Sequence, residues 1–210
     1  MKKLGLILVT VLAAGIVVAC GRNSSQTVSS DSSSTGATSA SVAKIANAGN
    51  DRVLVAYYSE SGNTQEVAET IASETGGDLF RVELANPFTD EDLNWNDRES
   101  RIVREYENES ERSSELQVST PDNWADYDTV FIGYPMWWQQ AAWPLQSFIR
   151  QNNFEGKTVI PFATSMSSEM GDSGQNLAAL GNGGDWQEGR RFSSSGNNQA
   201  VMDWVRELGY

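Results

Sequence analysis

The sequence contains no histidine, and Cys20 is its single cysteine. Without imidazole the chain has no Ser-His-Asp triad, and it lacks both the commonest general base and the commonest ligand of transition metals. One cysteine cannot form a disulfide within the chain. Since no other side chain stands out as a catalytic acid or base, we identify no catalytic residue and expect any chemistry to depend on a bound cofactor.

Basic residues are also scarce. The 210 residues include 15 Lys and Arg against 28 Asp and Glu, which gives a formal net charge of −13 at pH 7. Such a surface repels nucleic acid and anionic lipid headgroups. We therefore expect no nucleic-acid partner and predict that binding partners are neutral or basic.

The first twenty residues have the pattern of an export signal. Lys2 and Lys3 precede an apolar run over residues 4–19, which is short for a bilayer that needs about 20 apolar residues. A buried core helix or a membrane span is the alternative. The residues 17-VVA-19 resemble a bacterial lipobox, which implies cleavage after residue 19 and lipidation of Cys20. The pattern predicts a protein that is lipid-anchored at the extracytoplasmic side of the cell membrane.

The segment over residues 20–50 begins at that cysteine and continues with Ser, Thr, Ala, Gly and Asn, with hardly a large apolar side chain. Such a composition cannot bury enough apolar surface to offset the entropy of ordering, so we predict a flexible tether. The remaining residues, 51–210, have the usual length of one domain.

Apolar runs and amphipathic segments alternate through this domain. Near-continuous apolar strands separated by helices indicate an α/β fold with a parallel sheet covered on both faces. The predicted strands lie at 52–58, 78–84, 128–134, 157–164 and near 187–192, and the predicted helices lie at 63–75, around Leu145, Phe148 and Ile149, at 175–180 and at 197–208.

A highly charged segment at about 87–118 interrupts the alternation. Ile102, Val103 and Tyr106 fit one helical face, yet the sequence offers no obvious surface for that face to pack on. We predict an inserted, partly helical loop at the edge of the domain. A solvated face and a partner-docking surface are both compatible with its charges.

The first loop of interest, 59-SESGNT-64, joins a predicted strand to the N-terminus of a helix. Unpaired backbone N–H groups and the helix dipole favour an anion at that position. Ser59, Ser61 and Thr64 add hydroxyl donors, Asn63 adds an amide, and Gly62 permits positive φ. The loop could hold a phosphate without a cation, although a serine-rich turn and helix cap would have the same composition.

Two further loops should meet the first, because ligands of open parallel sheets bind at the carboxyl ends of the strands. The loop 135-PMWWQQAAW-143 contains Trp137 and Trp138, of which at least one should face the mouth of the sheet as a platform for a flat conjugated ligand. Core packing is the alternative, above all for Trp143. The small residues of 164-TSMSSEMGDSG-174 permit close backbone approach to a ligand, but they are also typical of a surface loop.

With these loops the sequence resembles flavodoxin. The loop 59-SESGNT-64 is similar to the loop that binds the phosphate of flavin mononucleotide (FMN) in that family. The segments 131-FIGYPMWW-138 and 161-PFATSMSS-168 resemble the second and third loops of a flavodoxin-like branch of bacterial exported and quinone-reductase-like proteins. The resemblance runs from about Arg52 to Leu208. It implies a three-layer sandwich with a five-stranded parallel sheet in the order 2-1-3-4-5.

The resemblance also implies FMN as the cofactor and a set of residues that bind it. The phosphate would be bound by Ser59, Ser61, Gly62, Asn63 and Thr64, the isoalloxazine ring would be flanked by Pro135, Met136, Trp137 and Trp138, and Thr164 and Ser165 would meet the pyrimidine edge or the ribityl chain.

The function implied is a membrane-anchored electron carrier that exchanges electrons with redox partner proteins or small acceptors. An FMN-dependent NAD(P)H:quinone-type reductase is the alternative, although the sequence has no G-x-G-x-x-G dinucleotide fingerprint. A non-redox binding lipoprotein that retains the fold is a third possibility, since fold does not imply function.

Overall fold

The computed structural model describes residues 51–112, 115–194 and 196–210. The predicted signal peptide, the lipidated Cys20 and the tether at 20–50 lie outside the described residues. Within the described ranges, no helix combines the length and hydropathy needed to cross a membrane.

The predicted parallel sheet is present, with the strand order β2-β1-β3-β5-β6. This order is the predicted 2-1-3-4-5, but the sheet has seven strands instead of five. Two short strands, β6 and β7, share the fifth position by pairing with opposite ends of β5, and β4 pairs with the end of β3 in antiparallel fashion. The strands are β1 (Val53–Tyr57), β2 (Asp78–Arg81), β3 (Thr129–Trp137), β4 (Gln140–Ala141), β5 (Thr158–Ser165), β6 (Asp185–Trp186) and β7 (Arg190–Ser193).

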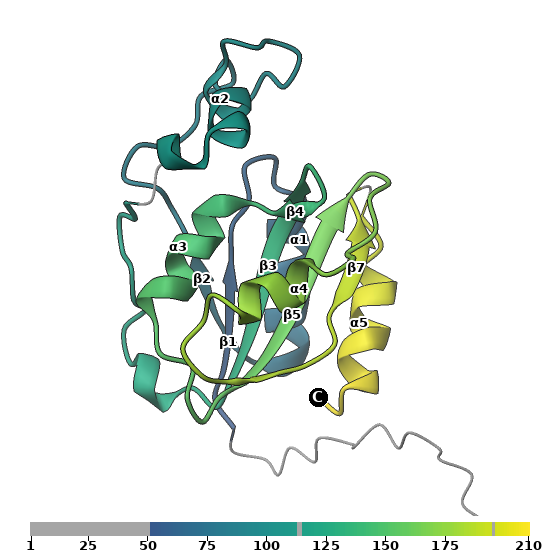
Figure 1. The fold of residues 1–210 in the computed structure, drawn as a ribbon. Helices are drawn as coiled ribbons and strands as arrows, with labels where there is room; N and C mark the ends of the chain where they lie inside the picture. The colour runs from purple at the N-terminus through teal and green to yellow at the C-terminus, as the bar shows by residue number, and fades with distance from the viewer. Residues whose placement is uncertain (1–50, 113–114, 195) are drawn as a thin grey trace, which may run out of the picture. The chain divides into compact units, whose positions relative to one another are not determined.

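Helices cover both faces of the sheet, as Figure 1 shows. The helices α1 (Asn63–Thr75) and α5 (Asn198–Glu207) lie on one face, and α3 (Trp143–Gln151) and α4 (Ser173–Ala178) lie on the other. Successive strand residues point to opposite faces, so Val55 packs with α1 and α5 whereas Leu54 packs with α3 and α4. The apolar residues of the central strands are therefore buried on both sides, as the sequence predicts.

The charged insertion follows β2 and contains α2 (Arg101–Glu107) and the 3-10 helix η1 (Glu109–Glu111), before the 3-10 helix η2 (Trp124–Asp126) leads into β3. In Figure 1 the insertion lies beyond the carboxyl ends of the strands. The sequence offers no obvious surface for its apolar residues, and the structure provides one. Phe88, Ile102 and Val103 of the insertion form a small core with Leu84 and Trp143, which belong to the rest of the domain.

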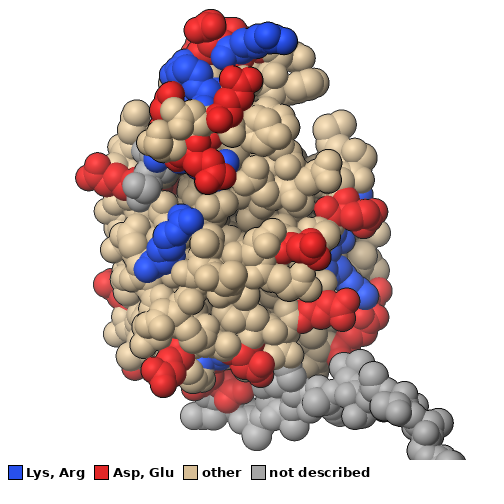
Figure 2. All heavy atoms as spheres, in the orientation of Figure 1, with Lys and Arg blue, Asp and Glu red and all other residues tan. Residues whose placement is uncertain are grey.

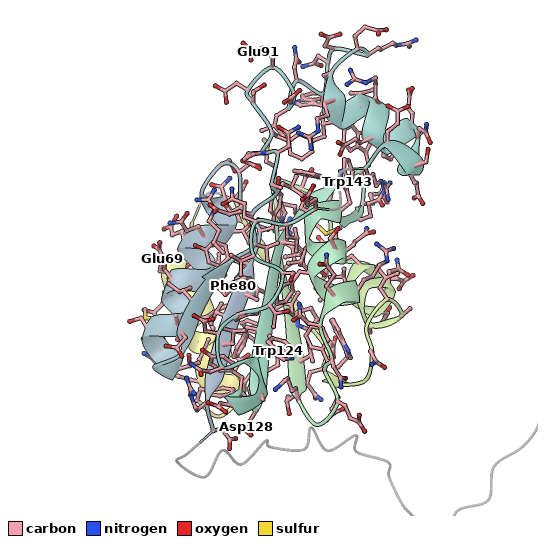
Figure 3. All side chains as sticks on the ribbon, turned by 90° about the vertical axis from the view of Figure 1, so that its left-hand side faces the viewer. Glu69, Phe80, Glu91, Trp124, Asp128 and Trp143 are labelled. Atoms are coloured by element: carbon pink, nitrogen blue, oxygen red, sulfur yellow. The ribbon has the colours of Figure 1, made fainter. Side chains whose placement is uncertain are left out.

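A buried carboxylate connects the insertion to the first residue of α3. Glu105 accepts hydrogen bonds from Arg101 Nε at 2.6 Å and from Trp143 Nε1 at 2.6 Å. Figure 3 shows Trp143 at the end of α3 that faces the insertion. The guanidinium of Arg112 lies 4.7 Å from the centre of the Trp143 ring. These contacts fix where the insertion lies above the sheet.

Candidate functional site

The loop between β1 and α1 has the backbone of an anion-binding turn. Gly62 is the N-cap of α1 and adopts φ 85°, and no side-chain hydrogen bond from the described residues caps the helix. A Cβ at Gly62 would meet no atom within 4 Å, so glycine is favoured here by its backbone conformation and not by crowding. The first backbone N–H groups of α1 are therefore left without a side-chain acceptor, which suits an anionic group.

Side-chain hydrogen bonds organise this loop and join it to the loop after β5. Asn63 Nδ2 donates to Ser61 Oγ at 2.9 Å. The hydroxyl groups of Thr64 and Thr164 lie 2.8 Å apart, and both residues are buried. One of these two hydroxyls donates to the other, so the acceptor retains its own hydrogen for a ligand. The pair brings together two loops that the sequence places a hundred residues apart.

The loop after β3 forms a tight hairpin. Trp137 pairs with Gln140 across β3 and β4, and the two residues between them, Trp138 and Gln139, have φ values of 45° and 63°. Two consecutive positive φ values are the requirement of a type I′ turn, which usually takes Asn or Gly. This turn allows both indoles to line one pocket, which an extended loop would prevent. The Trp138 ring stacks on the Tyr106 ring, with 4.4 Å between the ring centres.

A pocket of about 630 Å³ lies where these loops meet, a volume within the usual range of ligand sites. Most of the predicted binding residues line it, namely Ser61, Asn63, Thr64, Pro135, Met136, Trp137, Trp138, Thr164 and Ser165. The other two do not. Ser59 is 3% exposed and its carbonyl accepts a hydrogen bond from Arg81, and Gly62 shapes the turn through its backbone.

Part of the pocket lining comes from the charged insertion, which sequence reasoning did not place at the site. Asp90, Leu93, Trp95 and Ile102 all line the pocket. A signal was available in 91-EDLNWND-97, where a leucine and a tryptophan stand among polar residues. The remaining lining residues that the sequence analysis did not assign to the site are Glu60, Met166 and Ser194.

The charges that line the pocket are negative. Glu60 and Asp90 are its charged lining residues, and no Lys or Arg lines it within the described part of the chain. Glu60 is half-buried, and its carboxylate accepts a hydrogen bond from the Tyr58 hydroxyl at 2.5 Å. Burial, together with this carboxylate, raises the pKa of Tyr58 above its ordinary value. A phosphate in this pocket would thus be bound by uncharged donors.

The residues present fit the group that the family resemblance implies. The free N-terminus of α1, Ser61, Asn63 and Thr64 supply the N–H and O–H donors that a phosphate monoester requires. Met136, Trp137 and Trp138 supply the flat apolar wall that a conjugated ring system requires. Donors and aromatic wall line the same pocket, so a single molecule with a phosphate at one end and a ring at the other can contact both.

Two solved structures from Bacteroides species are similar to this chain. A protein assigned as a flavoprotein from Bacteroides eggerthii DSM 20697 is 36% identical, with a TM-score of 0.68, and the match covers 77% of this chain and 99% of the other. A second such protein, from Bacteroides uniformis ATCC 8492, is 34% identical, with a TM-score of 0.68 and coverage of 75% and 99%. Comparison with curated proteins found no match.

A third solved structure shares the fold at lower identity. It is a flavoprotein in complex with FMN from Lactobacillus acidophilus NCFM, 20% identical over 74% of this chain and 99% of that one, with a TM-score of 0.54. The sequence also matches the family profile of flavodoxin across residues 52–208, which is nearly all of the domain described above. The chain is therefore a member of the flavodoxin family.

Proposed function

We propose that this protein binds FMN in the pocket at the carboxyl ends of the strands and carries electrons between redox partners. The observation that carries the proposal is the convergence of three loops, distant in sequence, on one pocket that both phosphate donors and indoles line. Membership of the flavodoxin family supports FMN as the cofactor.

The roles of the chain's own residues follow from their positions. The N-terminus of α1 and the hydroxyl of Thr64 bind the phosphate, while Trp137 and Trp138 orient the ring system and exclude water from one side of it. FMN, when bound, supplies electron transfer in steps of one or two electrons. The acidic residues Glu60 and Asp90 disfavour additional negative charge in the pocket, so we expect the bound flavin to be harder to reduce than free FMN.

The test is an anaerobic spectroelectrochemical titration of the purified protein after addition of FMN. Two separate one-electron steps at potentials below those of free FMN would support an electron carrier. Potentials unchanged from those of free FMN would contradict the electrostatic argument. Absence of flavin binding would refute the proposed function and favour a non-redox lipoprotein.

We also propose that the chain is anchored at the extracytoplasmic side of the membrane by a lipid on Cys20, with residues 20–50 as its tether. The support is the lipobox-like sequence before the only cysteine. Cys20→Ala should move the protein from the membrane fraction to the soluble fraction and remove the mass of the lipid. An unmodified Cys20 in the purified protein would contradict this proposal.

A second candidate function is an FMN-dependent reductase of small acceptors. It is favoured by the wall that the insertion adds to the pocket, since Leu93, Trp95 and Ile102 extend the cavity beyond the three flavodoxin-like loops. A single two-electron reduction step and steady oxidation of NAD(P)H with a small acceptor would favour the reductase over the carrier.

A further inference from the structure

The large hydrophobic side chains that remain exposed are concentrated at the pocket. Those above one third exposed in the described part of the chain are Leu79, Trp95, Tyr106, Val118, Trp138 and Met166. Three of them, Trp95, Trp138 and Met166, line the pocket, and Tyr106 stacks on Trp138. An apolar cluster around a cavity usually marks a place where a ligand or partner is bound.

Trp95 is the most exposed aromatic residue of this group, at 70%. It comes from the insertion, whereas the residues expected to bind the flavin come from the three loops at the strand ends. Leu93 and Ile102 of the insertion line the same pocket. Ile102 belongs to the small core beneath the insertion, and Leu93 packs against that core. Trp95 therefore projects from a surface that is itself anchored.

The backbone that carries Trp95 is held by a series of hydrogen-bonded turns. Thr89 and Asp92 exchange hydrogen bonds between side chain and backbone, at 3.0 and 3.2 Å. The N–H of Asp97 bonds to the carbonyl of Asn94 at 3.0 Å, and the N–H of Ile102 bonds to the carbonyl of Asp92 at 2.9 Å. Because the backbone at Trp95 is already ordered, a ligand that contacts the indole has only the side chain to order.

The electrostatics of this wall restrict the kind of ligand. Asp90 lies next to the apolar residues, and the pocket has Glu60 as its other charged group. Figure 2 shows acidic side chains interleaved with arginines over the insertion, while the arginines themselves do not line the pocket. An anionic ligand would meet two carboxylates, and the described residues that line the pocket include no Lys or Arg to offset them. An uncharged planar compound would gain stacking area without that repulsion.

We propose that Trp95, Leu93 and Asp90 form a second subsite, which binds uncharged planar aromatic compounds beside the cofactor and discriminates against anionic ones. This proposal rests on the proposed function, because it gives the reductase or carrier a place for a small aromatic acceptor. Trp95 supplies the stacking surface, Leu93 the apolar floor, and Asp90 the charge that repels anions.

The experiment compares two probes that differ in charge, 2-methyl-1,4-naphthoquinone and 1,4-naphthoquinone-2-sulfonate, by calorimetric titration of the full-length protein with and without FMN. We expect the uncharged probe to bind more tightly than the sulfonate. Trp95→Ala should raise the dissociation constant of the uncharged probe about tenfold, whereas Trp95→Phe should retain most of the affinity for that probe. Asp90→Asn should strengthen binding of the sulfonate about two- to threefold at low ionic strength.

The control is Leu79→Ala, which removes another exposed apolar side chain, on β2 and outside the pocket lining. It should leave both probes unaffected. The dissociation constant of FMN should be the same for Trp95→Ala and for the parent. The proposal is overturned if Trp95→Ala leaves the dissociation constant of the uncharged probe unchanged, or if it weakens FMN binding as much as probe binding. It is also overturned if the parent protein binds the sulfonate as tightly as the uncharged probe. Should the parent bind no FMN, the proposed function fails, and the subsite is judged by the same comparison on the FMN-free chain.

Discussion

Glu105→Leu should destabilise the protein by about 3–5 kcal/mol, the usual cost of removing one partner from a buried ion pair. The Glu105 side chain is 3% exposed and the Arg101 side chain 11% exposed. Leucine would leave the guanidinium buried without its carboxylate and the Trp143 N–H without its acceptor. Arg101 Nη1 would keep its hydrogen bonds to the backbone carbonyls of Asn86 and Pro87, but these are uncharged acceptors, and Nη2 already lacks a partner among the described residues.

The assay is urea unfolding, followed by tryptophan fluorescence and circular dichroism. At a denaturant dependence of about 2 kcal/mol per molar urea, the expected loss lowers the midpoint by about 2 M. Glu107→Leu is the matched control, because Glu107 belongs to the same helix and is exposed. Hydrogen exchange should locate the change, with amides of α2 losing protection at a lower free energy than those of β3.

A loss below about 1 kcal/mol for Glu105→Leu would refute the view that this carboxylate holds the insertion on α3, since such a value is typical of exposed pairs. Equal losses for Glu105→Leu and Glu107→Leu would refute it as well.

Three further predictions concern the pocket and the residues around it. Thr64→Val should weaken FMN binding about 10- to 100-fold in a fluorescence titration, because a hydrogen bond to a charged oxygen contributes about 1.5–3 kcal/mol; an unchanged affinity would remove Thr64 from the phosphate site. Gly62→Val should cost about 1–3 kcal/mol in urea unfolding, since φ is 85° there and space is available, whereas Gly62→Asn should cost less; equal values for the two variants would contradict the backbone argument. The pKa of Tyr58 is raised by burial, so its contribution to stability is present below the unfolded pKa of about 10 and is lost as the pH rises above it. Above pH 10 the unfolding free energy of the Tyr58→Phe variant should therefore fall less steeply with pH than that of the parent, by about 1.4 kcal/mol per pH unit. Identical slopes for parent and variant would show that Tyr58 ionises equally in the folded and unfolded states.

Local patterns were sufficient to predict the framework of this domain. Apolar runs such as 53-VLVAYY-58 and the helical spacing of Val67, Ala68 and Ile71 placed β1 and α1, and α1 has the predicted bounds 63–75. Gly62 between Ser61 and Asn63 pointed to a turn with positive φ, which the structure has. These features depend on neighbouring residues alone, and residues close in sequence are the ones whose geometry a periodic pattern describes.

The edge of the sheet was less predictable because short segments carry little pattern. The fifth strand position is divided between Asp185–Trp186 and Arg190–Ser193, each pairing with a different part of β5. The sequence indicated one strand near 187–192. At this sheet edge, the residues that pair with each end of β5 are determined by how the strands assemble, and a local sequence pattern does not contain that information.

The sequence by itself determined the fold class, the three loops and the composition of the phosphate-binding turn, because strand and helix periodicity and turn chemistry are local. Only the tertiary structure decided that the charged insertion forms a wall of the pocket. Its position depends on Glu105 meeting Trp143, 38 residues away, and on Phe88 and Ile102 sharing a core with that indole. No sequence pattern distinguishes the buried Glu105 from the exposed Glu107, or predicts that Trp95 is exposed. Burial is set by packing between distant segments and not by neighbours in the chain.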